Sequence, residues 1–297
     1  MRNSLVYYGV RFLAGLVGLL PGSAARRLGE FGGLLWYSFG GERKRLSRRH
    51  MARVLGEAAS PRSASPRAAD PPALTRRAFV SYGRYWAETL WVRPRRIAEV
   101  DGALEVVGLE HLRQAAIEGR GAVIALPHLG NWEPAALAGK RAGIEIVAVA
   151  EKLANRRLTE WFTSLRRQFG ITIVLAGRGS MRAIEAAVAR GAAVCLLCDR
   201  DLSGRGVRVK FFGEETTLPV GPAALVIRTG APLLIAACYF TPAGHRLVLV
   251  KPEVPADVRD VWEVTSLIAA GLEDLIRAAP EQWHLLQPNW PSDRSER

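Results

Sequence analysis

Hydrophobic residues after position 121 fall into short continuous runs, separated by stretches in which apolar positions recur every three or four residues. The runs are rich in valine, isoleucine and alanine, which is typical of strands buried on both faces. They cover 121–126, 144–150, 171–176, 192–198, 231–240 and 246–250. The helical patterns cover 132–141, 155–169, 180–190, 221–229 and the long 259–278. This alternation predicts an α/β fold with a mostly parallel central sheet flanked by helices.

The beginning of the chain carries a different pattern. Residues 4–21 form one apolar stretch, and its helix would be about 25 Å long at 1.5 Å per residue. That length is short for a membrane span. Arg11 lies near the middle, where a charge inside the bilayer costs roughly 2.5 kcal/mol or more. We therefore expect a helix that lies in the membrane interface, with an ordinary core helix and a secretory signal peptide as alternatives.

One low-complexity stretch divides the chain. Residues 57–73 are dominated by proline, alanine and serine and show no periodicity, so we expect a flexible loop. The loop separates an N-terminal helical, membrane-associating segment over 1–56 from a single α/β domain over 74–297. Core packing or a lipid-facing groove would explain the helical stripe that opens this domain. The stripe consists of Phe79, Tyr82, Tyr85, Trp86 and Leu90.

Charge is unevenly distributed along the chain. The 41 basic and 28 acidic residues give a formal net charge of +13, which favours an anionic partner. Residues 1–56 hold ten basic and two acidic residues, a net charge of +8, among many leucines and aromatic residues. Basic residues mixed with large apolar ones are typical of helices at a membrane surface. We therefore expect an anionic membrane surface as a partner, and no nucleic acid.

The three cysteines, Cys195, Cys198 and Cys238, lie in apolar runs. They form no disulfide framework, which suits a reducing compartment. Cys195 and Cys198 spell C-x-x-C, but the context "AAVCLLCD" is that of a buried strand, in which a free cysteine is usually a core residue. We therefore expect neither a metal site nor a redox motif.

Reactive side chains follow three of the predicted strands at the points where these strands end. His128 follows the first strand, Glu151 the second, and the Asp-Arg-Asp stretch 199–201 the fourth. In open α/β sheets, ligands bind outside the carboxyl ends of the strands. The sequence therefore predicts a site at this edge of the sheet.

His128 is the candidate general base. No serine stands in a G-x-S-x-G turn, and no glycine-rich phosphate-binding loop opens a helix after a strand. A histidine that acts directly on a substrate hydroxyl is then the economical chemistry. A carboxylate beside it would hold the imidazole in one tautomer and stabilise its charged form. Glu133 completes a local H-x4-E pattern, and Asp199 and Asp201 come from another strand end.

Geometry favours one of these acids as the partner. Asn131 predicts a helix N-cap, which puts Glu133 in the first helical turn. Positions five apart on a regular helix differ by about 140°, so Glu133 would not face His128. Parallel strands lie only about 4.8 Å apart, and a carboxylate can reach across that gap. We therefore favour Asp199, then Asp201, with Glu133 as an orienting residue.

Several stretches, in order over nearly the whole chain, resemble one enzyme family. "ALPHLGNWE" (125–133) resembles the H-x4-[DE] block of the lysophospholipid acyltransferases related to the bacterial lipid A lauroyl and myristoyl transferases. "LLCDRDLSGRGVRVKFFGE" (196–214) and "WHLLQPNWPSD" (283–293) resemble the phosphatidylinositol mannoside acyltransferase branch of that family. Further similar stretches lie at 48–56, 76–88, 150–153 and 165–170.

The resemblance implies a membrane-associated enzyme that moves a fatty acyl chain from acyl-CoA to a sugar hydroxyl of a phosphatidylinositol mannoside-type glycolipid. It implies His128 as general base, and Glu151, Arg166, Arg200 and His284 as residues near the acceptor. No cofactor is expected, because acyl-CoA is a substrate. The expected location is peripheral, on the cytoplasmic face of the inner (plasma) membrane.

Other functions remain as alternatives to this one. An acyltransferase for another glycolipid, such as a lipid A-type precursor, would use the same residues. A non-catalytic, membrane-peripheral lipid-binding protein would explain the basic amino terminus, but it leaves His128, Asp199 and Asp201 without a role. An esterase or lipase needs a nucleophilic serine at a strand-to-helix turn, and none is visible in the sequence.

Overall fold

A computed structural model describes residues 2–58, 70–255 and 257–294 of the chain. Its helices are α1 (Arg2–Val17), α2 (Gly22–Phe39), α3 (Gly41–Ala58), α4 (Pro71–Trp91), α5 (Ile97–Gly102), α6 (Leu109–Glu118), α7 (Leu137–Ala142), α8 (Arg156–Arg167), α9 (Ser180–Ala189), α10 (Gly221–Thr229) and α11 (Val261–Ala278). Its strands are β1 (Leu104–Val107), β2 (Ala122–Leu126), β3 (Ile146–Ala150), β4 (Ile171–Leu175), β5 (Ala193–Leu197), β6 (Val207–Phe211), β7 (Glu214–Leu218), β8 (Leu233–Phe240) and β9 (His245–Val250). Short 3-10 turns are η1 (Pro94–Arg96), η2 (Pro134–Ala136), η3 (Pro280–Gln282) and η4 (Pro291–Asp293).

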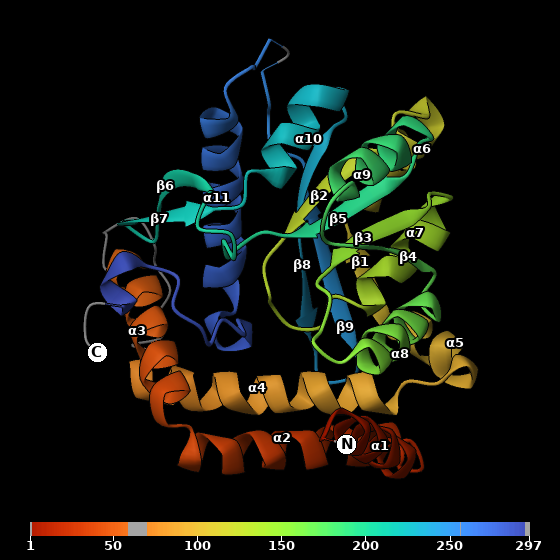
Figure 1. The fold of residues 1–297 in the computed structure, drawn as a ribbon, viewed down its shortest axis with the longest axis vertical. Helices are drawn as coiled ribbons and strands as arrows, with labels where there is room; N and C mark the ends of the chain where they lie inside the picture. Colours follow the sequence, from red (N-terminus) through yellow and green to blue (C-terminus); the bar gives the residue numbers. More distant parts are fainter. Residues whose placement is uncertain (1, 59–69, 256, 295–297) are drawn as a thin grey trace.

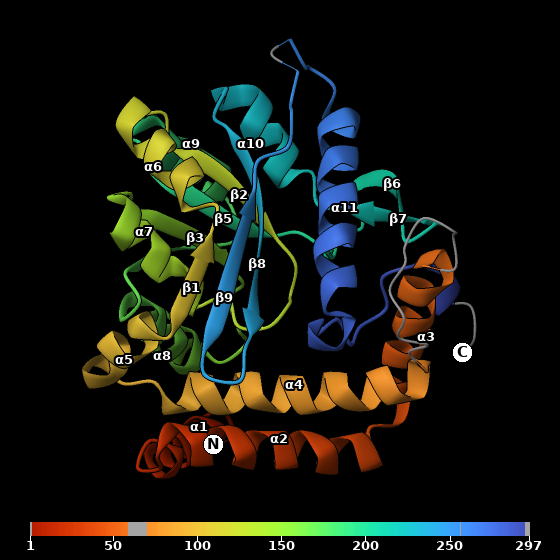
Figure 2. The ribbon, with the colours of Figure 1, turned by 180° about the vertical axis from the view of Figure 1, so that it is seen from behind.

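The central sheet has the order β1-β9-β8-β2-β5-β3-β4 over the described residues. Neighbouring strands run parallel except for β8 and β9. Helices cover both faces, so the predicted α/β fold with a mostly parallel sheet is confirmed (Figures 1 and 2). The predicted strands are present as β2, β3, β4, β5, β8 and β9. The sequence pattern does not predict β1. Residue propensity over 209–213 allows a hairpin as one alternative, and the structure has the antiparallel hairpin β6–β7 there.

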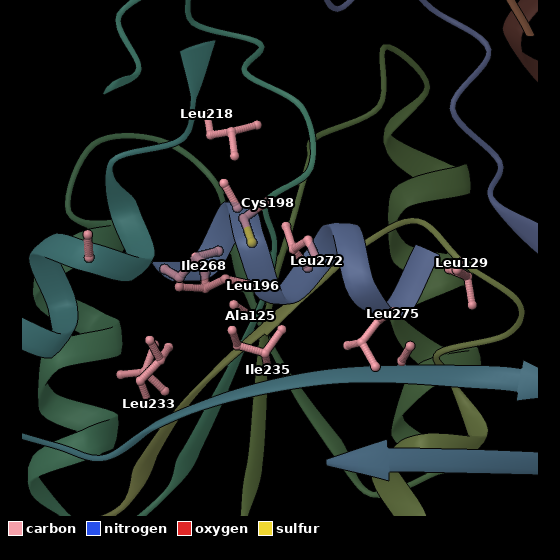
Figure 3. Close-up of a cluster of buried hydrophobic side chains, with 14 of the residues drawn as sticks. Ala125, Leu129, Leu196, Cys198, Leu218, Leu233, Ile235, Ile268, Leu272 and Leu275 are labelled. Carbon is pink, nitrogen blue, oxygen red and sulfur yellow. The ribbon is translucent and has the colours of Figure 1, made fainter. Parts of the chain in front are cut away.

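Alternate residues of the central strands face two different helical layers. In β2, Ala125 belongs to one core cluster and Ile124 to the other, and both are buried. Figure 3 shows the first layer, in which Ala125 and Ile235 of the sheet face Ile268 and Leu272 of α11. Full burial of each large aliphatic side chain stabilises the fold by about 1.5–3 kcal/mol. This packing fixes the height of β2 and its neighbours, and with it the position of their carboxyl ends.

Helices α1 and α2 form a separate layer against α4, at the bottom of Figures 1 and 2. The contact between α2 and α4 is at backbone distance. A Cβ atom added to Gly33 would lie 2.1 Å from the carbonyl oxygen of Phe79, and one added to Gly83 would lie 2.1 Å from that of Gly29. Any larger residue at Gly33 or Gly83 would force the two helices apart. Large apolar side chains on α2 remain exposed at Leu28, Phe31, Leu35 and Phe39.

Helix α1 is mostly exposed rather than part of the core. Among its described side chains, only Ala14 and Val17 are buried. The alternative of an ordinary core helix is therefore wrong for α1. The helix also ends at Val17, earlier than the predicted helix over 4–20. No helix within the described residues is long and apolar enough to cross a membrane.

The bounds predicted for the loop, 57–73, are wrong at both ends. Helix α3 continues to Ala58, and α4 already begins at Pro71. Proline suits the first turn of a helix, because the N–H that it lacks would have no partner there and its φ is already helical. Residues 59–69 of the predicted loop lie outside the described residues.

Candidate active site

His128 and Asp199 lie side by side at the carboxyl edge of the sheet. Strands β2 and β5 are parallel neighbours, and their register sets Leu126 opposite Leu197. In each case the reactive side chain follows two residues later. The shared register therefore brings His128 and Asp199 to the same level, one strand spacing apart.

The Asp199 carboxylate contacts both the ring and the backbone of His128. Oδ1 lies 2.6 Å from Nδ1 of His128. Oδ2 accepts the backbone N–H of His128 at 3.0 Å and the indole N–H of Trp283 at 2.8 Å. Burial alone would raise the pKa of Asp199, but the charge of His128 and these hydrogen bonds outweigh it and hold the pKa below its usual value. The acid therefore stays ionised and can accept a hydrogen bond from the Nδ1–H group of His128.

This contact determines which nitrogen of His128 can act as a base. When Nδ1 keeps its proton and donates a hydrogen bond to Asp199, the free lone pair is on Nε2. His128 lines a large cavity, and its side chain is 26% exposed, whereas the side chain of Asp199 is fully buried. Trp132 meets the histidine ring edge-on, with 5.6 Å between ring centroids. The arrangement can therefore take a proton from a ligand in the cavity.

The chain after the histidine is not the helix that the pattern predicted over 132–141. A 3-10 turn comes first, and α7 begins only at Leu137. Asn131 is therefore no helix N-cap. Its Oδ1 accepts the N–H of Glu133 at 3.3 Å, and its Nδ2 donates to Oε2 of Glu88 at 3.0 Å. A side-chain-bonded turn of the kind that asparagine favours replaces the expected first helical turn.

Glu133 belongs to a different group of residues. Its Oε1 accepts the hydroxyl of Tyr85 at 3.3 Å and lies 3.4 Å from Nε of Arg166. Burial raises the pKa of Glu133, and the charge of Arg166 offsets part of that effect. Across residues 2–58, 70–255 and 257–294, no hydrogen bond or ion pair joins Glu133 to His128. Glu133 of the H-x4-E pattern is therefore not the carboxylate paired with His128. Arg166 points inward, toward Glu133.

Asp201 is occupied by its own loop. Its Oδ1 accepts the backbone N–H and the hydroxyl of Ser203, each at 2.8 Å. Its Oδ2 accepts the N–H of Gly206 at 2.7 Å and the hydroxyl of Thr217 at 3.0 Å. Partial burial opposes ionisation, but these hydrogen bonds hold the pKa of Asp201 below its usual value. Asp201 therefore shapes the loop after β5, and it makes no hydrogen bond to His128 in the described structure.

Glu151 and Arg200 meet on the cavity wall. Nη2 of Arg200 lies 3.3 Å from Oε1 of Glu151. The Glu151 side chain is 60% exposed and that of Arg200 only 15%. The ends of β3 and β5 thus deliver an acid and a base beside His128, which lines the same cavity. Their part in holding an acceptor stays a prediction.

His284 packs beside the pair. Its backbone N–H donates to the carbonyl oxygen of His128 at 2.7 Å, and its Nε2 lies 2.8 Å from the hydroxyl of Ser81. Its ring lies 4.9 Å from that of Tyr82. Burial, followed by the charge of His128, lowers the pKa of His284 to about 3. The ring is therefore neutral at neutral pH.

Sequence reasoning missed Trp283, which reaches the Asp199 carboxylate. One signal could have found it, because a buried tryptophan usually finds a hydrogen-bond acceptor for its indole N–H. A tryptophan next to a candidate site histidine is therefore a candidate for that contact.

The cavity beside His128 has a volume of about 530 Å³. Most of its wall is apolar and comes from the sheet face opposite α11. Its polar lining residues, among them His128, Glu151, Arg166 and Arg200, lie toward the carboxyl ends of the strands and on α8. Both its size and this division are typical of small-molecule sites, and the apolar part suits a hydrocarbon chain. The apolar wall includes Leu112, Ile124, Ile146, Ile171, Ile173 and Leu249.

The two C-x-x-C cysteines have different surroundings. Cys198 is a core residue, as predicted, whereas Cys195 is also part of the cavity wall. Burial raises the pKa of the Cys195 thiol to about 12, so it is no thiolate nucleophile at neutral pH. In the part of the chain that the structure describes, no three His, Cys, Asp or Glu side chains are grouped as metal ligands would be.

Known proteins resemble the chain over most of its length. Residues 1–292 match the family described as "Bacterial lipid A biosynthesis acyltransferase". The chain is 36% identical over 286 residues to a phosphatidylinositol mannoside acyltransferase of Mycobacterium tuberculosis, which covers 93% of this chain and 86% of that protein. A protein of the same name from Mycolicibacterium smegmatis is 34% identical over 252 residues, 84% of this chain and 80% of the relative. The lipid A biosynthesis palmitoleoyltransferase of Escherichia coli is 24% identical over 184 residues, 60% of this chain and 58% of that protein.

Proposed function

Because the chain belongs to the bacterial lipid A biosynthesis acyltransferase family, we propose that it transfers a fatty acyl chain from acyl-CoA to a sugar hydroxyl of a phosphatidylinositol mannoside-type glycolipid. Acyl transfer itself follows from the family. The acceptor is inferred from the names of the two mycobacterial relatives, which match over most of their length. The observation that carries the mechanism is the His128–Asp199 pair, with 2.6 Å between Nδ1 and Oδ1, beside an apolar cavity.

In the proposed reaction, His128 acts as the general base. Nε2 takes the proton of the sugar hydroxyl while the hydroxyl oxygen attacks the thioester carbonyl carbon. The new C–O bond moves the carbonyl electron pair onto oxygen and gives a tetrahedral oxyanion. The carbonyl then re-forms, the C–S bond breaks, and its electron pair leaves with the CoA sulfur. The imidazolium returns its proton to that sulfur, so the products are an ester and the free CoA thiol.

Asp199 supports both halves of this cycle. It holds the Nδ1 proton, which keeps the lone pair on Nε2 before attack. Its negative charge then stabilises the imidazolium between the two proton transfers. The carboxylate itself need not be protonated at any step.

The cavity is the proposed site of the acyl chain. Its apolar wall removes methylene groups from water, and each buried CH₂ contributes about 0.8 kcal/mol. The thioester would then lie near His128, where the polar lining residues begin. Glu151, Arg166 and Arg200 line that same region, which supports their proposed contact with the acceptor.

An anionic membrane surface is the proposed partner of α1 and α2. Three phenylalanines there are far more exposed than is usual for this residue: Phe12 at 69%, Phe31 at 57% and Phe39 at 84%. The same two helices carry the exposed basic residues Arg11 and Arg27. Such a surface gains energy from apolar insertion and about 1 kcal/mol for each basic residue near anionic lipid. The proposal therefore locates the enzyme peripherally, on the cytoplasmic face of the inner membrane.

Some basic residues of 1–56 form ion pairs within the protein and do not face a membrane. Arg26 lies 3.7 Å from Glu88. Arg53 lies 2.7 Å from Glu214. These ion pairs join α2 and α3 to the rest of the protein, so the +8 counted from the sequence exceeds the charge that faces a membrane.

Acceptor-dependent release of the CoA thiol tests the proposed reaction. The full chain is incubated with palmitoyl-CoA and vesicles that contain or lack a phosphatidylinositol mannoside. We expect thiol release only with the glycolipid, together with a lipid product heavier by one acyl group in mass spectrometry. Equal release without the glycolipid would make the protein a hydrolase. Acyl transfer only to a lipid A-type precursor would show that the acceptor is that glycolipid and not the mannoside. Vesicle binding without thioester consumption would show that the protein is a lipid-binding protein.

Vesicle flotation tests the proposed membrane surface. The variant Phe12→Glu/Phe31→Glu places charges on α1 and α2, and Ile117→Glu is the matched control. Ile117 is 81% exposed on α6, which lies far from α1 and α2 in both views (Figures 1 and 2). We expect the double variant to lose most of its binding to anionic vesicles and the control to keep it, with salt weakening the binding of the unmodified protein. Equal flotation of the three proteins would remove this surface from the proposal.

A further inference from the structure

The C-terminal segment, residues 282–293, crosses the carboxyl edge of the sheet and contacts the backbone around His128. Leu129 and Trp283 form an antiparallel β-bridge. On either side of the bridge, Gly130 N–H donates to the Gln282 carbonyl at 2.8 Å, and the N–H of residue 284 donates to the carbonyl of His128 at 2.7 Å. The position of the His128 backbone therefore depends on this segment.

The side chain of Trp283 contacts the other half of the pair. Its indole N–H donates to Oδ2 of Asp199 at 2.8 Å, and both side chains are fully buried. Oδ2 also accepts the backbone N–H of His128 at 3.0 Å. Because Oδ2 accepts two hydrogen bonds, the carboxylate is held in one orientation, in which Oδ1 faces the imidazole. Trp283 therefore holds the acid through its side chain, while its two neighbours, Gln282 and His284, hold the backbone around His128.

We propose that Trp283 is a positioning residue for acyl transfer, which acts through Asp199 by orienting its carboxylate toward His128. This inference rests on the proposed function and adds a residue to it. Trp283 does not line the cavity, so it reaches the substrate only through the pair. Its indole N–H also stabilises the ionised carboxylate, in the way that outer hydrogen bonds orient and tune a reacting group.

The indole has little freedom to turn away. Four aromatic rings surround it, with centroid distances of 5.6 Å to Phe212, 5.8 Å to His50, 6.2 Å to Phe211 and 6.4 Å to Trp290. Close packing of this kind holds a side chain in one rotamer. The hydrogen bond to the carboxylate is therefore made by a group whose direction is already fixed.

The far end of the C-terminal segment is fixed to α3. Oδ2 of Asp293 accepts the backbone N–H groups of Asn289 at 2.9 Å and Trp290 at 3.1 Å, and it lies 3.2 Å from Nε2 of His50. Arg53 adds an ion pair at 2.9 Å to the other carboxylate oxygen. Helix α3 thus holds the segment whose first residues position the pair.

Asn289 gives the same segment a second contact with the acid. Its side-chain amide donates to the backbone carbonyl of Asp199 at 3.2 Å. The segment therefore holds Asp199 at its carboxylate through Trp283 and at its backbone through Asn289. These two contacts come from residues six apart, so the segment has to keep its shape for both to form.

A matched pair of tryptophans separates positioning from packing. Trp283→Phe removes the N–H to Asp199. Trp290→Phe removes an indole N–H to the carbonyl of Phe211 at 3.1 Å, from the same segment and with the same complete burial. Replacement of Trp283 by β-(3-benzothienyl)alanine removes the N–H and keeps the ring shape, which covers the case in which Trp283→Phe fails to fold.

Kinetics give the first measurement. We expect Trp283→Phe to lower kcat about 10- to 100-fold with KM for palmitoyl-CoA unchanged, and Trp290→Phe to leave kcat within about threefold. In the Asp199→Asn background, Trp283→Phe should lower kcat no further, because the carboxylate that the indole N–H orients is absent. An equal loss in that background, or an equal loss in Trp290→Phe, would show a purely structural role and overturn the proposal.

Proton NMR of the free protein gives a measurement that needs no substrate. The Nδ1–H of His128 in its bond to Asp199 should give a low-field resonance that is absent in His128→Ala. Trp283→Phe should shift or broaden this resonance, and Trp290→Phe should leave it in place. An unchanged resonance in Trp283→Phe refutes the positioning role even if the unmodified protein transfers acyl groups. A changed one upholds that role even if the glycolipid acceptor has been assigned wrongly.

Discussion

The His128–Asp199 and His245–Glu88 pairs are alike in contact and different in surroundings. The closest nitrogen–oxygen distances are 2.6 Å and 2.8 Å, and both carboxylates are buried. His128 lines the cavity with a quarter of its side chain exposed, whereas the His245 side chain is only 7% exposed and is not part of the cavity wall. A buried histidine–carboxylate contact alone therefore does not identify an active site in this fold.

Both carboxylate oxygens of Glu88 are held by contacts within the fold. Oε1 of Glu88 accepts Nε–H of Arg84 at 2.9 Å, and Oε2 accepts the amide of Asn131 at 3.0 Å in addition to His245. Burial alone would raise the pKa of Glu88, but the hydrogen bond and charge of His245, the charge of Arg84 and the amide lower it to about 2. These contacts join α4, the turn after His128 and the start of β9, which is a structural task.

The Asp199 pair differs because one side of it remains open to a ligand. Its acid is held by donors from the protein, while Nε2 of His128 is left for a proton from the cavity. The strand register delivers both residues to the edge where α/β folds bind ligands. Access at a strand end, added to the pairing, is what distinguishes a candidate active site from a structural ion pair.

The largest expected effect is that of His128→Ala on turnover. Loss of the general base should lower kcat roughly 10²- to 10⁴-fold, with no loss of folded protein in a thermal melt. His245→Ala should do the reverse. It should keep the turnover of each folded molecule and lower the free energy of unfolding by about 3–5 kcal/mol, because the buried carboxylate of Glu88 loses a partner. Turnover of folded His128→Ala within about tenfold of the unmodified protein would remove His128 from the mechanism.

The next effect is that of Asp199→Asn on the pH–rate profile. Turnover should fall by about 10²-fold or more, since the asparagine amide can hold the wrong tautomer. The acidic limb of the profile should move to lower pH, because an imidazolium without its anion gives up its proton more readily. Rates measured across pH with saturating substrate would show both changes. Glu88→Gln serves as the control, and an identical shift in that variant would contradict the distinction between the two pairs.

Much of the site follows from the pattern of the sequence. The apolar runs that become β2 and β5 end on reactive residues, and a parallel register between neighbours is enough to bring His128 and Asp199 together. The favoured choice of Asp199 over Glu133 used strand spacing and helix geometry. The choice also assumed that these two strands are neighbours, which the sheet order confirms. The helical half of the argument was wrong, because α7 begins only at Leu137.

Other parts depend on contacts that no local pattern reveals. The hairpin β6–β7 turns at Phe212 and Gly213, both with positive φ, where a sequence reader expects Asn-Gly. Phe212 tolerates this conformation because its ring is buried against Trp283 and its N–H reaches the side chain of Glu273. Tertiary packing thus overrides the turn preference.

The turn after His128 illustrates the same limit. Asn131 has the residue type of a helix N-cap, but Glu88 of α4 holds its amide. Glu88 is 43 positions away in sequence, so this contact is invisible in the local pattern. Trp283 was missed for the same reason, because its acceptor on Asp199 lies 84 positions earlier.

A smaller effect concerns the acid stability that Glu88 provides. Its pKa of about 2 lies below the ordinary 4.5, so its charge stabilises the folded state above about pH 4.5. That contribution, about 3 kcal/mol, disappears as the pH falls from 4.5 toward 2. Urea unfolding should therefore separate Glu88→Gln from the unmodified protein by about this amount at pH 7, with the gap closing in acid. A gap that stays constant with pH would show that the charge of Glu88 contributes nothing and that the loss is steric.

The smallest effect is expected for Glu133→Gln, the substitution that bears on the H-x4-E spacing. Glu133 contacts Tyr85 and Arg166, and a glutamine can keep a hydrogen bond to each. Its carboxylate makes no contact with the His128 ring in the described structure, so removal of its charge leaves the imidazolium paired with Asp199. Turnover should fall by less than about tenfold, through the placement of Arg166, and the acidic limb of the pH–rate profile should not move. Glu133→Gln could instead reproduce both the large loss of turnover and the pH shift of Asp199→Asn. In that case Glu133 is the partner of His128 during the reaction, and the His128–Asp199 contact is present only in the free enzyme.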